Sequence, residues 1–116
     1  MSRRFLRYHR TQDDIWSHIE LDDDGWALRQ VDLRGPRQAP VTATSLAAVR
    51  HIRDHQDLAA MRTYEARYGV LSEGSWDGWE QDAQANEIPA TDFGALWSTA
   101  RKASAAVTGP PRNLCA

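Results

Sequence analysis

The chain has 116 residues, of which 41% are hydrophobic and 26% charged, and its formal net charge is −2. These values are typical of one globular domain, and they exclude a chain whose overall charge would draw it to nucleic acid or to a membrane surface. We expect a single domain over residues 1–104 and a flexible tail over residues 105–116, where Gly109 precedes two prolines.

The single cysteine, Cys115, excludes a disulfide framework and a cysteine-ligated metal site. The first ten residues contain four arginines and no apolar core of a signal peptide. No apolar run approaches the ~20 residues needed to cross a bilayer. We therefore expect a cytoplasmic protein with no membrane contact.

The chain opens with a predicted strand over residues 4–10, in which Phe5, Leu6 and Tyr8 have strand-type character. After a turn at residues 11–14, two strand-like runs flank the sequence Asp-Asp-Asp-Gly at positions 22–25. Acidic residues followed by glycine between such runs are a strong hairpin signal. The sequence therefore predicts a β-hairpin over residues 15–33.

The hairpin is expected to have an apolar face and a mixed face, because successive side chains of a strand point to opposite sides. The apolar face would carry Ile15, Ile19, Leu21, Trp26 and Leu28. The mixed face would carry Trp16, His18, Glu20, Arg29 and Val31. A loop centred on Asp23 and Asp24 would place Leu21 opposite Trp26 and His18 opposite Arg29, with Glu20 diagonal to Arg29.

Helices are expected in the second half of the chain. After a short edge strand over residues 38–43, Leu46, Val49 and Ile52 follow at helical spacing, with Arg50, Arg53 and Asp54 facing away from them. A second stripe over residues 58–68 is out of phase with the first, which indicates two helices or one kinked helix, with Gly69 as a C-cap. A last helix, capped by Thr91, would run from residue 92 to residue 103 and bury Phe93, Leu96, Trp97 and Ala100.

These elements predict an α+β fold: a small antiparallel sheet of three to four strands, packed on one face by two to three helices. The helices would cover the apolar face of the hairpin. The mixed face would then be the solvent-facing side of the sheet.

Two groups of short motifs resemble a known family. The first is Ile-Glu-Leu-Asp-Asp-Asp-Gly-Trp at residues 19–26 with Arg-Gln-Val-Asp-Leu at residues 29–33, and the second includes Phe-Gly-Ala-Leu-Trp at residues 93–97. The pattern is similar to a family of small uncharacterised bacterial α+β domains, with an acidic hairpin and a closing Phe-x-x-x-Trp helix. Residues 44–68 depart from its shorter pattern. The resemblance implies a compact domain and assigns no activity to any residue.

The mixed face is one candidate site. Trp16, His18, Glu20 and Arg29 would bring together an aromatic wall, an imidazole, an acid and a base, which could orient a small polar ligand or take part in proton transfer. The alternative is an ordinary solvated sheet face whose charges pair for solubility.

Trp76 and Trp79 are the second candidate, in an acidic loop over residues 72–86 where a tryptophan is hard to bury. Either they anchor a protein partner or a second copy of the chain, or they fold back over the core as a lid. From residue 68 to residue 100 there is no Lys or Arg. This stretch either forms an interaction face or lies near the basic N-terminal end and is partly neutralised by it.

Other sequence features argue against specialised chemistry. His51 and His55 have the i, i+4 spacing of shared metal ligands, but no third ligand accompanies them, so we expect solvent-facing histidines and no metal. No helix-turn-helix or zinc-finger spacing supports nucleic acid recognition by the N-terminal arginines. No phosphate loop, nucleophile elbow or cofactor motif is present.

The hypothesis that the sequence favours is a small non-catalytic binding or accessory protein that acts through protein–protein contact, of an immunity or inhibitor type. Its acidic loop would suit a basic partner. The alternative is a small enzyme or small-molecule-binding protein that uses the His, Glu, Arg and Trp side chains of the mixed face. A homodimer is compatible with either hypothesis.

Overall fold

The computed structural model describes residues 3–106, so Cys115 and the expected tail from residue 107 onward lie outside the described residues. Within that range the chain forms five strands, three α-helices and one 3-10 turn. In chain order the elements are β1 (Arg4–Arg10), β2 (Ile15–Leu21), β3 (Ala27–Arg34), β4 (Ala39–Ser45), α1 (Leu46–His55), α2 (Leu58–Tyr68), η1 (Trp79–Gln81), β5 (Ala85–Glu87) and α3 (Ala90–Ala106).

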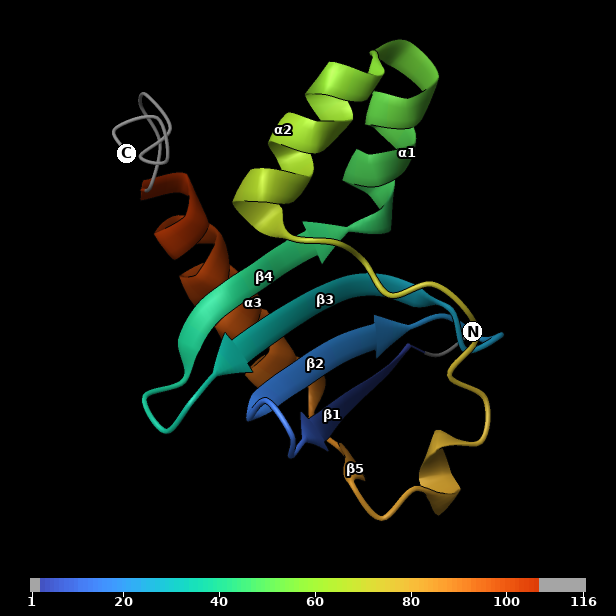
Figure 1. Cartoon of the computed structure of the whole chain (residues 1–116). Helices are drawn as coiled ribbons and strands as arrows, with labels where there is room; N and C mark the ends of the chain where they lie inside the picture. The colour runs from blue at the N-terminus through green and yellow to red at the C-terminus, as the bar shows by residue number, and fades with distance from the viewer. Residues whose placement is uncertain (1–2, 107–116) are drawn as a thin grey trace.

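The strands form one antiparallel sheet in the order β4-β3-β2-β1-β5, which confirms the predicted α+β class and adds a short fifth strand at one edge. Figure 1 shows α3 crossing behind the sheet, while α1 and α2 stand beyond the end of β4. The segment after α2 crosses the front of the sheet before it descends toward η1 and β5. None of the helices in the described part of the chain is long and apolar enough to span a membrane.

The hairpin forms where expected, but the predicted strand register was wrong by one residue at Leu21 and by two residues from Glu20 onward. Leu21 lies opposite Ala27, a bulge follows, and Glu20 then lies opposite Arg29 and His18 opposite Val31. One residue of the difference comes from a longer loop and the other from the bulge. Because two single shifts restore the alternation, Trp16, His18, Glu20, Arg29 and Val31 still share one face of the sheet.

The loop is longer because Asp22 organises it. Its Oδ1 accepts hydrogen bonds from the backbone N–H groups of Asp24 (2.9 Å) and Trp26 (3.0 Å). Gly25 has a φ of 83°, a left-handed conformation that glycine adopts without steric cost. These local bonds compete with strand pairing, so Trp26 stays outside the ladder between β2 and β3.

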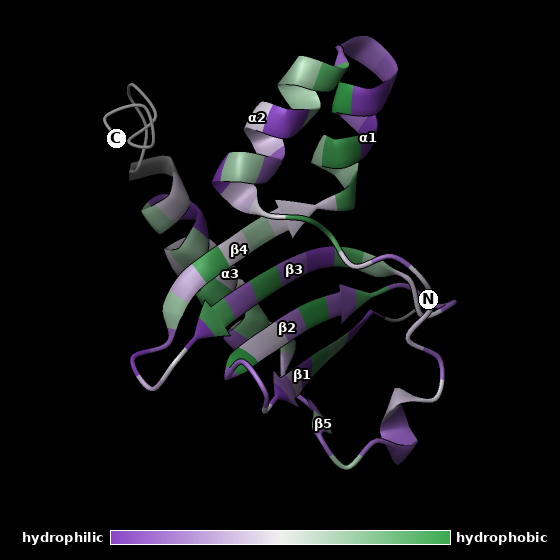
Figure 2. Cartoon of the chain, viewed as in Figure 1, coloured by the Kyte–Doolittle hydropathy of each residue, from purple (hydrophilic) through white to green (hydrophobic). Residues whose placement is uncertain are grey.

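The two faces of the sheet are covered differently from the prediction. The mixed face packs against α3, where Val31, Leu33 and Ala43 meet Phe93 and Ala100 in one apolar core. The apolar face, with Leu6, Ile19, Leu21 and Ala27, is covered by Leu71, Trp76 and Trp79 rather than by an α-helix. Figure 2 shows hydrophobic and hydrophilic residues interspersed along β2 and β3, as expected of a sheet that is covered on both sides.

The helices begin and end largely where the sequence predicted. Ser45 caps α1 by accepting from the backbone N–H of Ala48, and Asp57 caps α2 by accepting from that of Ala60, so residues 46–68 form two helices. Gly69 ends α2 with a φ of 86°. α3 begins at Ala90 rather than after Thr91, because the carbonyl of Pro89 already accepts from the N–H groups of Asp92 and Phe93.

Arg101 joins α3 to α2 and to the outer edge of β4. Its guanidinium donates to the carbonyl of Ala43 (3.0 Å) and to the hydroxyl of Tyr64 (3.0 Å), and it lies over the rings of Tyr68 and Trp97. The Tyr64 hydroxyl in turn accepts from the backbone N–H of Ser45. The side chain therefore connects three elements that meet at one edge of the sheet.

The basic N-terminal strand and the acidic loop do meet. Arg4 pairs with Glu80 (2.8 Å) and Glu87 (2.9 Å), and its guanidinium lies over the ring of Trp79. These contacts hold β5 and η1 against β1. They neutralise only two of the carboxylates in the stretch that lacks Lys and Arg.

Candidate functional site

The four candidate residues of the mixed face lie on one side of the sheet, as predicted, but that side faces α3 and not solvent. His18 is only 4% exposed. The carboxylate of Glu20 accepts from Nε of Arg29 at 2.6 Å, and the Arg29 guanidinium lies 5.0 Å from the ring of Phe93 and 5.1 Å from that of Trp97. Trp16 is stacked on His9, with ring centroids 3.9 Å apart. Trp16 packs against the core that joins the sheet to α3, and Arg29 contacts two aromatic rings of that helix, so this face is engaged in packing.

Burial determines the electrostatics of His18. Desolvation lowers its pKa below the ordinary value of 6.5, and the positive charge of Arg7, its partner on β1, lowers it further. The carbonyl of Val31 is 3.3 Å from Nδ1, and a carbonyl can only accept, so Nδ1 carries the proton of the neutral ring. The sequence placed Arg29 opposite His18, whereas the structure places Arg7 of β1 and Val31 of β3 on its two sides.

The free energy of unfolding is expected to fall as the pH is lowered below about 6.5. In that range the unfolded chain binds a proton at His18 that the folded chain does not, so stability falls by at most ~1.4 kcal/mol per pH unit from this residue. Urea unfolding of the wild type and of His18→Asn, measured between pH 7.5 and about 5, should give a shallower dependence for the variant. An equal dependence in the wild type and in His18→Asn would contradict this assignment.

Trp76 and Trp79 pack as a lid over the apolar face of the sheet. Both are partly buried against the core around Leu6 and Ile19, and Trp76 meets the ring of Tyr8 edge-on at 5.6 Å. The structure thus supports the lid interpretation for the inner sides of these rings. A different tryptophan, Trp26, remains 47% exposed.

The hairpin loop, residues 22–26, and the lid segment, residues 71–79, dock onto each other at one end of the molecule. The N–H of Trp76 donates to the carbonyl of Gly25 (2.8 Å), and Trp26 forms an isolated antiparallel bridge with Ser75. Ser75 Oγ also donates to the carbonyl of Asp24. We call the resulting surface the acidic tip, and it comprises Asp22, Asp24, Trp26, Glu73 and Asp77.

The acidic tip carries negative charge that the rest of the described chain does not neutralise. Within residues 3–106, none of Asp22, Asp24, Glu73 and Asp77 forms an ion pair with an arginine, lysine or histidine. Asp22 uses one oxygen to hold the loop, and the Asp77 carboxylate accepts no hydrogen bond from the part of the chain that the structure describes. The tip therefore combines an exposed indole with several uncompensated carboxylates.

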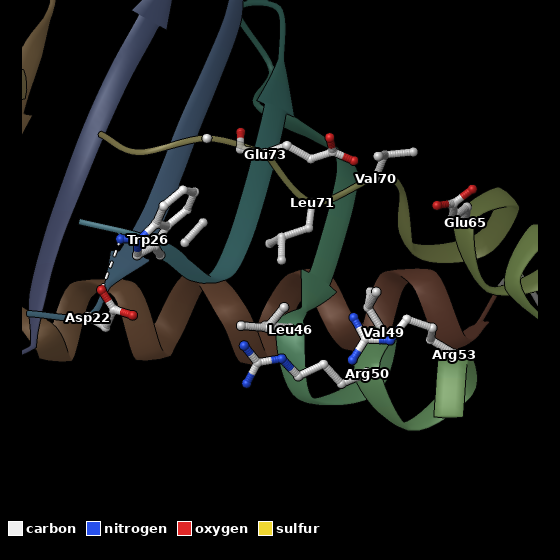
Figure 3. A pocket seen from close by; sticks show the side chains of 13 residues that line it. Asp22, Trp26, Leu46, Val49, Arg50, Arg53, Glu65, Val70, Leu71 and Glu73 are labelled. Carbon is white, nitrogen blue, oxygen red and sulfur yellow. Dashed lines mark hydrogen bonds between the residues drawn. The ribbon is translucent and has the colours of Figure 1, made fainter. Parts of the chain in front are cut away.

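A groove opens beside the acidic tip, between α1, the hairpin loop and the segment after α2. Its volume is about 520 Å³. Figure 3 shows Leu46, Val49 and Leu71 around its centre, Trp26 at one end and Glu65 toward the other. The arginines that were expected to face away from the apolar side of α1, Arg50 and Arg53, line the groove together with Leu46 and Val49.

Sequence reasoning overlooked this wall of α1 although its signal was present. Residues 46, 49, 50 and 53 follow the i, i+3, i+4, i+7 spacing of a single helical face. Ile52 is the only buried residue of α1, so the helix has little other packing to satisfy. An arginine on that spacing can line a groove with its stem beside apolar neighbours and its charged end in water.

The two histidines of α1 are stacked, with ring centroids 4.7 Å apart, and His55 Nδ1 lies 3.1 Å from the carbonyl of His51. Among residues 3–106, no group of three or more histidine, cysteine, aspartate or glutamate side chains is arranged to hold a metal ion.

Comparisons of the chain with protein-family models, with curated proteins and with solved structures found no match.

Proposed function

We propose that the protein is a small non-catalytic binding protein that holds a basic protein partner at its acidic tip, in the manner of an immunity or inhibitor protein. The observation that carries this proposal is the docking of the lid segment onto the hairpin loop. It brings Asp22 and Asp24 of the hairpin loop together with Glu73 and Asp77 of a distant segment, around the exposed ring of Trp26.

The chemistry of the tip favours a protein partner. An exposed tryptophan surrounded by charge is the typical composition of an interaction hot spot with a polar rim. Carboxylates without internal partners attract a basic surface and speed its association. The backbone hydrogen bonds at Gly25, Trp26 and Trp76 hold the tip in one arrangement before binding, which reduces the entropy lost on association.

Photo-crosslinking in the native host tests the proposal. Trp26 would be replaced by benzoylphenylalanine, which keeps an aromatic ring at the exposed position, and intact mass spectrometry would follow the products. We expect one dominant adduct with an arginine- or lysine-rich protein. The same replacement of Leu58, which is 63% exposed on α2, should give no such adduct.

A charge-neutralised variant tests the role of the carboxylates. Asp24→Asn, Glu73→Gln and Asp77→Asn together should lower the yield of the adduct by about tenfold or more, since each lost rim charge weakens binding by roughly 0.5–1 kcal/mol. A matched triple variant, Asp13→Asn, Asp54→Asn and Asp92→Asn, changes the net charge equally and should retain the adduct. Equal yields from the two triple variants would overturn the proposal.

The alternative, a small-molecule or catalytic site on the mixed face, has less support. His18 is buried beneath α3, and Arg29 already holds Glu20 and contacts two aromatic rings. None of the four residues lines the groove. A co-purifying small molecule whose binding is abolished by Glu20→Gln would favour this alternative.

A further inference from the structure

We infer that the groove beside the acidic tip binds a small apolar organic acid that carries a single negative charge. This inference does not depend on the basic protein partner proposed above, although the groove shares Asp22, Trp26 and Glu73 with the acidic tip. The inference rests on three features of the groove: its apolar walls, the two arginines of α1, and the carboxylates on its other sides.

The walls of the groove would accept a hydrocarbon chain. Leu46, Val49 and Leu71 surround its centre, and Trp26 and Val70 line it while remaining 47% and 59% exposed. Few other large apolar side chains are this exposed within residues 3–106. Their exposure at one groove therefore indicates a binding surface. A volume of about 520 Å³ is that of a typical small-molecule site.

The arginines would bind the acid group. Arg50 forms no hydrogen bond or ion pair within residues 3–106, and Arg53 forms one there only with its exposed neighbour Asp54, through Nε at 3.1 Å. Both lie on the α1 wall beside Leu46 and Val49, as Figure 3 shows. A carboxylate placed there would meet free guanidinium donors while its chain lies against the apolar walls.

The acidic residues of the groove limit the charge of the ligand. Asp22, Glu65 and Glu73 line other parts of it, and none forms an ion pair with Arg50 or Arg53. A second negative charge at the far end of a ligand would approach these carboxylates and be repelled. The arrangement therefore favours a monocarboxylate over a dicarboxylate of the same length.

Titration with octanoate and decanoate, each below its critical micelle concentration, tests the inference by ¹H–¹⁵N NMR. We expect saturable shifts of the Trp26 indole N–H and of the Arg50 Nε–H signal. Decanoate should bind about tenfold more tightly than octanoate, because two further methylene groups leave water. Decanedioate should bind more weakly than decanoate.

A double variant separates charge recognition from simple apolar contact. Arg50→Gln with Arg53→Gln should weaken decanoate binding by about tenfold. Arg37→Gln with Arg62→Gln removes two exposed arginines outside the groove and should leave the affinity unchanged. The inference is overturned if no saturable shifts occur, if they map elsewhere, if decylammonium binds as tightly as decanoate, or if the two double variants bind equally.

Discussion

Replacing Phe93 with alanine is expected to lower the free energy of unfolding by about 3–5 kcal/mol. Phe93 is completely buried, its ring lies 5.3 Å from that of Phe5, and it belongs to the core that joins α3 to Val31 and Leu33. Its removal would leave a cavity between the helix and the sheet. Urea unfolding followed by tryptophan fluorescence measures the loss directly.

The matched control is Leu58→Ala, which truncates an apolar side chain that is 63% exposed. Its effect should stay within about 0.5 kcal/mol, because little burial is lost. If Phe93→Ala cost less than about 1 kcal/mol, α3 would not be packed on the mixed face as the structure shows. The same result would reopen that face as a binding surface.

Replacing Gly25 with alanine is expected to cost roughly 2–3 kcal/mol and to disturb the acidic tip. The φ of 83° is unfavourable for alanine. A Cβ at this position would lie 2.5 Å from Oδ1 of Asp77 and 3.2 Å from the Asp77 nitrogen. The carboxylate can rotate away, but the backbone must also shift, so Asp77 would leave its place in the tip.

Gly74→Ala provides a control on the same segment. Gly74 has a φ of 88°, and a Cβ there would meet nothing within 4 Å. This variant should therefore cost only the conformational term, roughly 1–2 kcal/mol, and leave the NMR signals of Asp77 and Trp76 in place. Equal losses and equal spectra for the two variants would show that the hairpin loop and the lid segment are not docked.

Much of the fold follows from local signals that are strong in this sequence. Ser45, Asp57 and Gly69 mark helix ends through their own hydrogen bonds and φ angles, so they could be identified without tertiary contacts. The face to which each residue from Arg29 to Leu33 belongs was also predictable, because the longer loop and the bulge cancel in the alternation of the strand. Which residues of β2 and β3 lie opposite each other could not be predicted. Asp22 fixes the length of the loop through side-chain hydrogen bonds, and a pattern of hydrophobic residues does not reveal these bonds.

The candidate sites depended on contacts between distant segments, and here the sequence was less informative. Placing α3 on the mixed face requires knowing that Arg29 can lie against Phe93 and Trp97 while paired with Glu20. Asp22 keeps Trp26 out of the ladder, and the backbone of Trp26 instead forms a bridge with Ser75, 49 residues later. Hydrophobic periodicity reports neither arrangement, because both depend on contacts between segments that are far apart in the chain.

The edge of the sheet at β4 has a further consequence for self-association. The carbonyl of Ala43 is taken by Arg101 and the N–H of Ser45 by Tyr64, so two backbone groups that an added strand would need are already satisfied. Pro40 lies in the same strand, and β5 at the opposite edge has only three residues. Such features protect a sheet against strand addition and amyloid-like growth. A second copy of this chain would therefore have to associate through side chains, and the protein should resist edge-to-edge aggregation when it is concentrated.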